Sequence, residues 1–276
     1  MAHPDLRPLS LLSGGTASSS EPWTPMPYRD APHYDSAQVL KHWDRLHVGQ
    51  GLPPPAKGPL AEGWALYHSG EFERAAHLGL RLGHDGLILC NQATAIYATY
   101  LEPREAARQA LFRQVAERAA TQAAAEPDNC QALFWQAYAL GRYSQGISVA
   151  RALAQGLGSK LKGALEHVIE LEPQHAAAHI ALAAFHAEVI DKVGALVGRM
   201  TYGVRAETSI ELFEKGLSLH PRSAGALMEY ARGLLMLEGE GRTADATRLY
   251  ERAAALEPVD ARERLDIELA RAGLTD

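Results

Sequence analysis

The sequence predicts an all-α fold of about five consecutive helical hairpins stacked into a superhelix, with a closing helix at the C-terminus. From residue 59 onward, apolar residues recur at spacings of three and four almost without interruption, which is the pattern of amphipathic helices. In addition, helix-like segments end at prolines that stand 46, 48 and 37 residues apart, namely Pro127, Pro173, Pro221 and Pro258. A spacing of this size suits a repeated pair of helices.

The clearest repeat runs from Ser223 to Pro258. Small residues, Ala231 and Ala246, stand where two antiparallel helices would cross closely, and Tyr250 is large enough to fill the wider gap beside them. Proline offers no backbone N–H and therefore ends the second helix. This order of small, aromatic and proline positions resembles the tetratricopeptide repeat.

The first 58 residues differ in composition from the rest. Ten of the fifteen prolines lie at or before Pro59, and the run from Ser13 to Ser20 is rich in serine and glycine, so we predict a leader without regular structure. One short amphipathic helix is expected within it, at about 36–47, with Ser36 as its N-cap. Its apolar side carries Val39, Leu40, Trp43 and Leu46. This helix either caps the first repeat or lies in the groove of the array as an internal ligand, and the sequence leaves both open.

The predicted repeat domain covers residues 59–276. Its second repeat, roughly Gly86 to Glu126, has no register that the sequence fixes, although Pro103 suits a first helical position. The third and fourth repeats are longer than the usual 34 or so residues. Their extra residues fall at Ser144–Lys162 and Asp191–Glu207, and we expect these insertions to project on one side of the array and to contribute to binding.

After Pro258, the chain is expected to form the closing helix. Arg262, Glu263 and Arg264 are predicted to face water there, because the last element of a repeat array needs a polar outer face.

Composition limits the partners and the compartment. The net charge is −6 and the estimated pI is about 6.1, so no basic field favours nucleic acid or an anionic membrane surface. Neither a signal-peptide apolar core nor a run of roughly 20 apolar residues is present in the sequence. Cys90 and Cys130 have no close cysteine partner, which argues against a disulfide framework or a zinc site. We therefore expect a soluble, cytoplasmic protein.

A more particular resemblance rests on two stretches, 134–188 and 196–221. They open with Phe134 and Trp135 and include the motif TYGVRAETS ahead of a long helix. These stretches resemble the divergent repeats of the regulators of microtubule dynamics, and the same layout is similar to the periplasmic repeat lipoproteins associated with TRAP transporters. The similarity covers roughly residues 60–272. This sequence lacks the lipobox cysteine, signal peptide and membrane anchor of those relatives.

The tetratricopeptide resemblance implies a concave face lined by the first helix of each repeat. The candidate groove residues transferred in this way are Trp64, Tyr67, His68, Phe134, Tyr138, Arg142, Glu188, Met228 and Arg232. Aromatic and arginine side chains carry much of the energy of protein interfaces, and an apolar groove suits an amphipathic or hydrophobic segment. Each aromatic side chain has the alternative of being core, because a register error of one residue moves it there. If the groove assignment holds, alanine at Trp64 and Tyr138 abolishes partner capture and leaves the melting temperature nearly unchanged.

Three histidines share one side of a predicted helix: His175, His179 and His186. HxxxH spacing is able to hold a divalent metal, but His179 and His186 fall at positions that pack against neighbouring helices, which favours a structural role. No phosphate loop, nucleophile elbow or metalloprotease motif is present.

The sequence therefore predicts a non-catalytic scaffold that binds a protein or peptide partner and needs no cofactor. The alternative is a repeat protein that binds a small hydrophobic ligand or a metal. Pairing of two arrays into a homodimer is left open.

Overall fold

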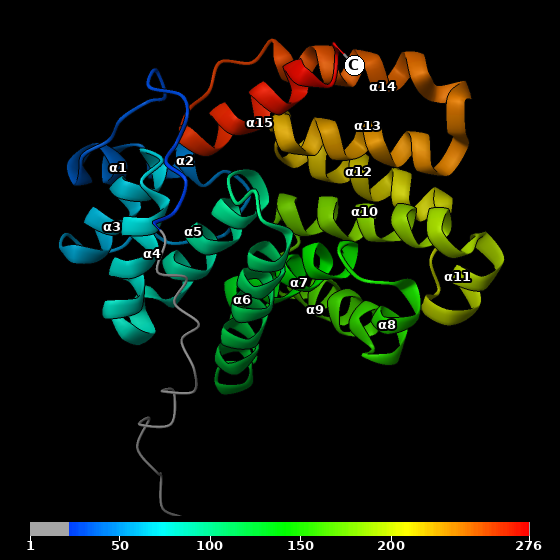
Figure 1. The fold of residues 1–276 in the computed structure, drawn as a ribbon, viewed down its shortest axis with the longest axis horizontal. Helices are drawn as coiled ribbons and strands as arrows, with labels where there is room; N and C mark the ends of the chain where they lie inside the picture. Colours follow the sequence, from blue (N-terminus) through cyan, green and yellow to red (C-terminus); the bar gives the residue numbers. More distant parts are fainter. Residues whose placement is uncertain (1–21, 276) are drawn as a thin grey trace, which may run out of the picture.

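Five helical hairpins follow one another along the chain, as the computed structural model of residues 22–275 shows (Figure 1). Each hairpin pairs a first helix with a second, antiparallel one, and no strand occurs in this part of the chain. The pairs are α3 (Pro59–His68) with α4 (Phe72–Arg81), α5 (Leu87–Tyr100) with α6 (Glu105–Ala125), α7 (Cys130–Gln145) with α9 (Leu157–Leu171), α10 (Ala176–Val193) with α12 (Ala206–Leu219), and α13 (Ala224–Glu238) with α14 (Thr243–Ala254). The predicted all-α repeat fold is confirmed.

The first helices begin at caps that the sequence supplies. The side chains of Asn129 and Ser223 each accept a hydrogen bond from a backbone N–H in the first turn, of α7 and α13 respectively. The second repeat departs from the prediction at Pro103. Helix α6 begins at Glu105 with Arg104 as its cap, so the proline lies just before the helix rather than in its first turn.

The two long insertions each contain a short extra helix, α8 (Val149–Ala154) and α11 (Ala195–Tyr202). Glycines in the left-handed region, with φ of +63° at Gly156 and +70° at Gly203, reverse the chain after each helix, a conformation that a side chain disfavours. Both helices lie on the same side of the molecule, at the lower right of the view (Figure 1).

Between α4 and α5, a 3-10 turn (η1, Gly83–Gly86) brings two backbones into contact. A Cβ placed on Gly79 would lie 2.7 Å from the carbonyl oxygen of Gly86 and 2.8 Å from the backbone nitrogen of Cys90. Glycine is therefore the residue that allows this close approach.

The N-terminal segment forms two short helices where one was expected, α1 (Ser36–Lys41) and α2 (Trp43–Leu46). The cap of α1 is Asp35 rather than Ser36, because the Asp35 carboxylate accepts from the Gln38 backbone while the Gln38 side chain accepts in return. Helix α1 packs on α3, and Val39, Trp43 and Leu46 are buried. The run Ser13–Ser20 of the predicted leader lies outside the described residues.

The last helix, α15 (Ala261–Ala272), turns back toward the first repeat. It packs against α13 and α14 and also reaches α3. The Tyr34 hydroxyl donates to the Val259 carbonyl at 2.5 Å, and Arg264 pairs with Asp30 at 3.1 Å. The first and last elements therefore meet, and the array closes into a ring (Figure 1).

This closure contradicts the expectation that Arg262, Glu263 and Arg264 face water. The Arg264 side chain is only 15% exposed and lies over the Tyr28 ring, whereas Arg262 and Glu263 line the interior of the ring. In a terminal cap the charged side of the last helix faces water. Helix α15 instead bridges the two ends of the array, so its charged side makes contacts with the rest of the protein.

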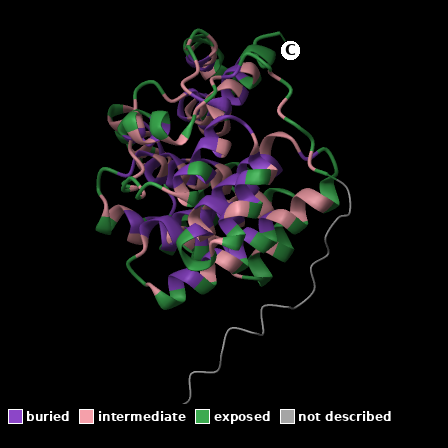
Figure 2. Ribbon diagram, turned by 90° about the vertical axis from the view of Figure 1, so that its left-hand side faces the viewer, coloured by how far each residue is buried: buried purple, intermediate pink, exposed green. Residues whose placement is uncertain are grey.

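Buried residues follow the inner faces of the hairpins around the ring, and exposed residues lie on its periphery (Figure 2). One large apolar cluster extends from the N-terminal segment to α10, and a second fills the C-terminal hairpin and α15.

Candidate binding cavity

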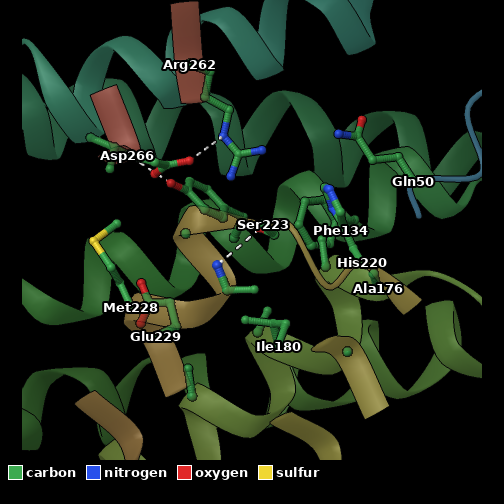
Figure 3. Close-up of a pocket in the computed structure, with 18 of the residues that line it drawn as sticks. Gln50, Phe134, Ala176, Ile180, His220, Ser223, Met228, Glu229, Arg262 and Asp266 are labelled. Atoms are coloured by element: carbon green, nitrogen blue, oxygen red, sulfur yellow. Dashed lines mark hydrogen bonds and ion pairs between the residues drawn. The ribbon is translucent and has the colours of Figure 1, made fainter. Parts of the chain in front are cut away.

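The ring encloses a central cavity of about 350 Å³ that remains partly open to solvent. Its walls are the first helices of all five hairpins, and α15 and residues 45–50 close the remaining sides. Arg262 and Asp266 project from α15 on one side, while Ile180 and Met228 approach from the opposite wall (Figure 3).

Eight of the nine predicted groove residues line this cavity. They come from α3, α7, α10 and α13 and are Tyr67, His68, Phe134, Tyr138, Arg142, Glu188, Met228 and Arg232. The structure thus places these side chains around one space, and their role in binding stays a prediction.

Trp64 is the exception. It is 2% exposed and does not line the cavity, because the N-terminal segment covers it. Its ring packs edge-to-face on Trp43 at a centroid distance of 5.6 Å and on His47 at 4.9 Å. Trp64 is therefore a core residue at the contact between the first repeat and the segment before it.

Two arginines and a glutamate occupy the wall formed by α7 and α13. Nη2 of Arg142 lies 3.0 Å from Oε1 of Glu229, and Nη1 of Arg232 lies 3.5 Å from the same oxygen. The guanidinium of Arg142 also stands 5.3 Å from the centre of the Tyr138 ring. Glu188 of α10 also lines the cavity within electrostatic reach of Arg142 and Glu229, so two arginines and two carboxylates lie together here.

The adjacent wall, on α15, carries the carboxylates of Asp260, Glu263 and Asp266. Asp266 accepts a hydrogen bond from the Tyr100 hydroxyl and lies 3.6 Å from Nε of Arg262, and burial raises the pKa of its carboxyl. Burial, followed by the nearby charge of Asp260, raises the pKa of Glu263 to about 7. The carboxylates of α15 therefore lie near the charged group of α7 and α13, and the lining of the cavity carries both signs of charge.

Two buried polar atoms in the cavity lining have no hydrogen-bond partner of ordinary geometry in the described residues. They are the Tyr67 hydroxyl and Oε1 of Gln92, and both residues line the cavity. The two side chains are neighbours, because the Gln92 side chain acts to lower the pKa of the Tyr67 hydroxyl, which burial raises overall.

A hydrogen-bonded chain fastens the closure at one edge of the cavity. Nδ1 of His68 lies 2.7 Å from Oδ2 of Asp260, the cap of α15, and Nε2 of His68 lies 3.1 Å from Nε2 of His47. Burial alone would raise the pKa of Asp260, but the hydrogen bonds from His68 and the Glu263 backbone, together with the charges of His68 and Arg262, lower that pKa overall. Burial, followed by the charge of His68, lowers the pKa of His47 to about 3. His47 therefore stays neutral, and its Nε2 is able to accept a hydrogen bond from His68.

The three histidines considered as metal ligands make separate contacts with the backbone. The His175 ring accepts from the Ala178 N–H at 3.1 Å, His179 contacts the Pro173 carbonyl at 3.0 Å, and His186 contacts Arg205. Across residues 22–275, no group of three or more His, Cys, Asp or Glu side chains is placed to hold a metal ion.

Sequence reasoning missed much of the lining from α5, α15 and the N-terminal segment, including Gln92, Tyr100, Asp266 and Gln50. Helix α5 is buried on nearly all sides, so it shows no one-sided periodicity from which its register could be read. In α15, the spacing of Arg262, Asp266 and Leu269 at i, i+4 and i+7 was a signal, since these positions share one helix face.

None of the helices in residues 22–275 combines the length and apolar character needed to cross a membrane.

Comparison with known proteins supports the fold and no finer assignment. No protein-family model matches the chain, and no curated protein matches it. Among solved structures it is similar to TTC0263, described as a thermophilic TPR protein of Thermus thermophilus, with a TM-score of 0.55 and 18% identity over 78% of this chain and 97% of that one. The resemblance to regulators of microtubule dynamics and to transporter-associated lipoproteins finds no support in these comparisons. The hairpins, their order and this structural match together show an all-α helical repeat fold of the tetratricopeptide type.

Proposed function

We propose that this chain is a non-catalytic binding protein that takes a short segment of a partner protein into the central cavity. The observation that carries the proposal is the convergence of eight predicted groove residues, from four separate helices, on one space of about 350 Å³. Tetratricopeptide folds in general mediate contacts between proteins, and the first helices of this array supply the concave wall.

The lining indicates the chemistry of the segment. Phe134, Met228 and Ile180 form an apolar wall, and Arg142 and Arg232 offer guanidinium groups that suit a carboxylate. Because α15 and residues 45–50 occupy part of the groove, the remaining space admits a few residues rather than a long helix. A chain end, with its carboxylate at the arginines and an apolar side chain beside Phe134, fits these features.

A small hydrophobic or amphiphilic ligand is the second candidate. The closure of the groove favours it, since cavities of roughly 300–1,000 Å³ with apolar walls and a few polar groups are typical of small-molecule sites.

Affinity capture from the native host followed by mass spectrometry, combined with native mass spectrometry of the purified protein, tests both candidates. The informative variants are Arg142→Met and Tyr138→Ala in the cavity, and Leu80→Ser, an exposed position on α4, is the matched control. The proposal expects a partner that the control retains and both cavity variants lose. A retained small molecule that depends on the same residues supports the second candidate, and capture unaffected by either cavity variant contradicts both.

A further inference from the structure

Helix α11 has its apolar side chains directed away from the protein. Leu196, Val197 and Met200 are 74%, 52% and 80% exposed, whereas Gly198 is the buried residue of this helix. A Cβ at Gly198 would lie 2.8 Å from Val204 and 3.0 Å from Val189, so the glycine face is the one packed on the array. Folding alone gives no reason to expose three large aliphatic side chains together.

Helix α8 shows the same feature. It has no buried residue, and Val149 and Leu153 are 40% and 44% exposed. The two insertions meet at Tyr202, whose ring lies so close to Gly158 that a Cβ there would be 2.8 Å away. Helices α8 and α11, which carry these exposed apolar residues, therefore lie on the same side of the molecule (Figure 1). We call these five side chains, Val149, Leu153, Leu196, Val197 and Met200, the insertion patch.

The surroundings of the insertion patch are basic, although the whole chain has a net charge of −6. The segments Ser144–Lys162 and Asp191–Glu207 contain six Lys or Arg residues and two carboxylates. Lys162 and Lys192 are paired with glutamates of their own helices. Arg151, Lys160 and Arg199 are exposed and make no ion pair in the part of the chain that the structure describes.

We propose that the insertion patch is a peripheral docking surface for an anionic lipid bilayer, with its aliphatic side chains in the interface and its cations at the lipid headgroups. Short amphipathic helices with apolar and Lys/Arg-rich sides bind membranes in this way. Each basic residue near an anionic surface strengthens binding roughly fivefold, and salt weakens this attraction.

Two other occupants fit less well. A second copy of the chain in a two-fold contact would bring the same three unpaired cations against their own copies, which is repulsive. A protein partner with a hot spot usually seats aromatic anchors in pockets, whereas the insertion patch is aliphatic and lines neither the central cavity nor the pocket beside α1, α3 and α4.

Co-sedimentation of the full chain with vesicles tests the proposal. We expect binding to vesicles containing phosphatidylglycerol, loss of binding on pure phosphatidylcholine, and weakening at 0.5 M salt by at least about tenfold. Leu196→Ser with Met200→Ser removes the apolar part, and Arg151→Glu with Lys160→Glu and Arg199→Glu reverses the basic part. Since all five positions are exposed, the melting temperature should stay unchanged in both variants.

The matched control reverses three exposed cations elsewhere, Lys57→Glu, Arg81→Glu and Arg222→Glu, so that total charge changes equally. Binding that this control retains and the patch variants lose supports the proposal. No binding to anionic vesicles at 0.1 M salt overturns it, as does equal loss in the control. Light scattering that shows a dimer dissociated by the serine variant would assign the surface to a second copy instead and would also overturn it.

Discussion

Arg142 and Glu229 are 87 positions apart, on the first helices of the third and fifth hairpins, and their side chains meet at 3.0 Å within the cavity. Each side chain is about one quarter exposed, so the pair is partly shielded from water. In a double-mutant cycle with Arg142→Met and Glu229→Gln, we expect a coupling of about 1 kcal/mol in the free energy of unfolding.

The exposed pair Arg74 and Glu71, at 67% and 41% exposure, is the control for that cycle, with an expected coupling below about 0.5 kcal/mol. Urea unfolding of the four proteins in each cycle measures both values. Equal coupling in the two cycles would show that the cavity does not shield Arg142 and Glu229.

Trp64 and Tyr138 should behave differently when each is replaced by alanine. Trp64→Ala removes a core side chain packed on Trp43 and His47, and we expect a loss of about 3–5 kcal/mol in stability. Tyr138 is only partly buried; Tyr138→Ala loses a 2.9 Å hydrogen bond with Thr99 and ring contacts with Trp135 and Arg142, and should cost about 1–3 kcal/mol, less than Trp64→Ala. Thermal unfolding distinguishes them, and a mild effect at Trp64 would contradict the packing described above.

Glu263→Gln should raise the melting temperature at pH 8 and change it little at pH 4. The folded protein raises the pKa of Glu263 from its ordinary 4.5 to about 7, so the folded state holds the proton more tightly than the unfolded state. Glu263 therefore contributes favourably to the free energy of unfolding below about pH 4.5, and this contribution is lost as pH rises through 7. Removing the buried charge should raise the free energy of unfolding by about 1 kcal/mol at pH 8, which corresponds to an increase of roughly 2–4 °C in melting temperature.

The difference between variant and wild type must be measured, because buried histidines have the opposite pH dependence. Burial lowers the pKa of His47 to about 3 and that of His175 and His220 to about 4. The stability that these neutral histidines contribute is therefore fully present above about pH 6.5 and is lost on acidification. Glu211→Gln, at an exposed carboxylate, is the control. A constant offset between pH 4 and pH 8 for Glu263→Gln would refute the assignment.

Two glycine-to-alanine substitutions should change the free energy of unfolding in opposite directions. Gly163 lies inside α9, and a Cβ added there would meet nothing within 4 Å, so Gly163→Ala should stabilise by about 0.5–1 kcal/mol through helix propensity. Gly79→Ala forces a Cβ against the backbone of Gly86 and Cys90 and should destabilise by about 1–3 kcal/mol. Chemical denaturation measures both, and a stabilised Gly79 variant would show that the contact relaxes.

The fold was predictable because its signals are local. Pro127, Pro173, Pro221 and Pro258 mark the ends of repeats, and caps such as Asn129 lie next to the helices they start. The walls of the cavity followed from the repeat register, which put Tyr67, Phe134 and Tyr138 on first helices facing inward.

The closure of the ring was not predictable, because its contacts are between residues far apart in the sequence. Asp260 has the local pattern of an ordinary cap and His68 that of a groove residue, and nothing local indicates that they pair. The burial of Trp64 has the same origin, since its position in the repeat is that of a concave residue and only the segment containing Trp43 covers it.

Joining the two ends also changes how the chain is expected to fold. An open solenoid resembles a one-dimensional array, in which each unit depends on its neighbours and unfolding spreads from an end. Here the bonds His68–Asp260 and Tyr34–Val259 span 192 and 225 positions, so contact order rises and neither end is free to fray first. The molecule should therefore fold more slowly than an open array of the same length and unfold in a single cooperative step.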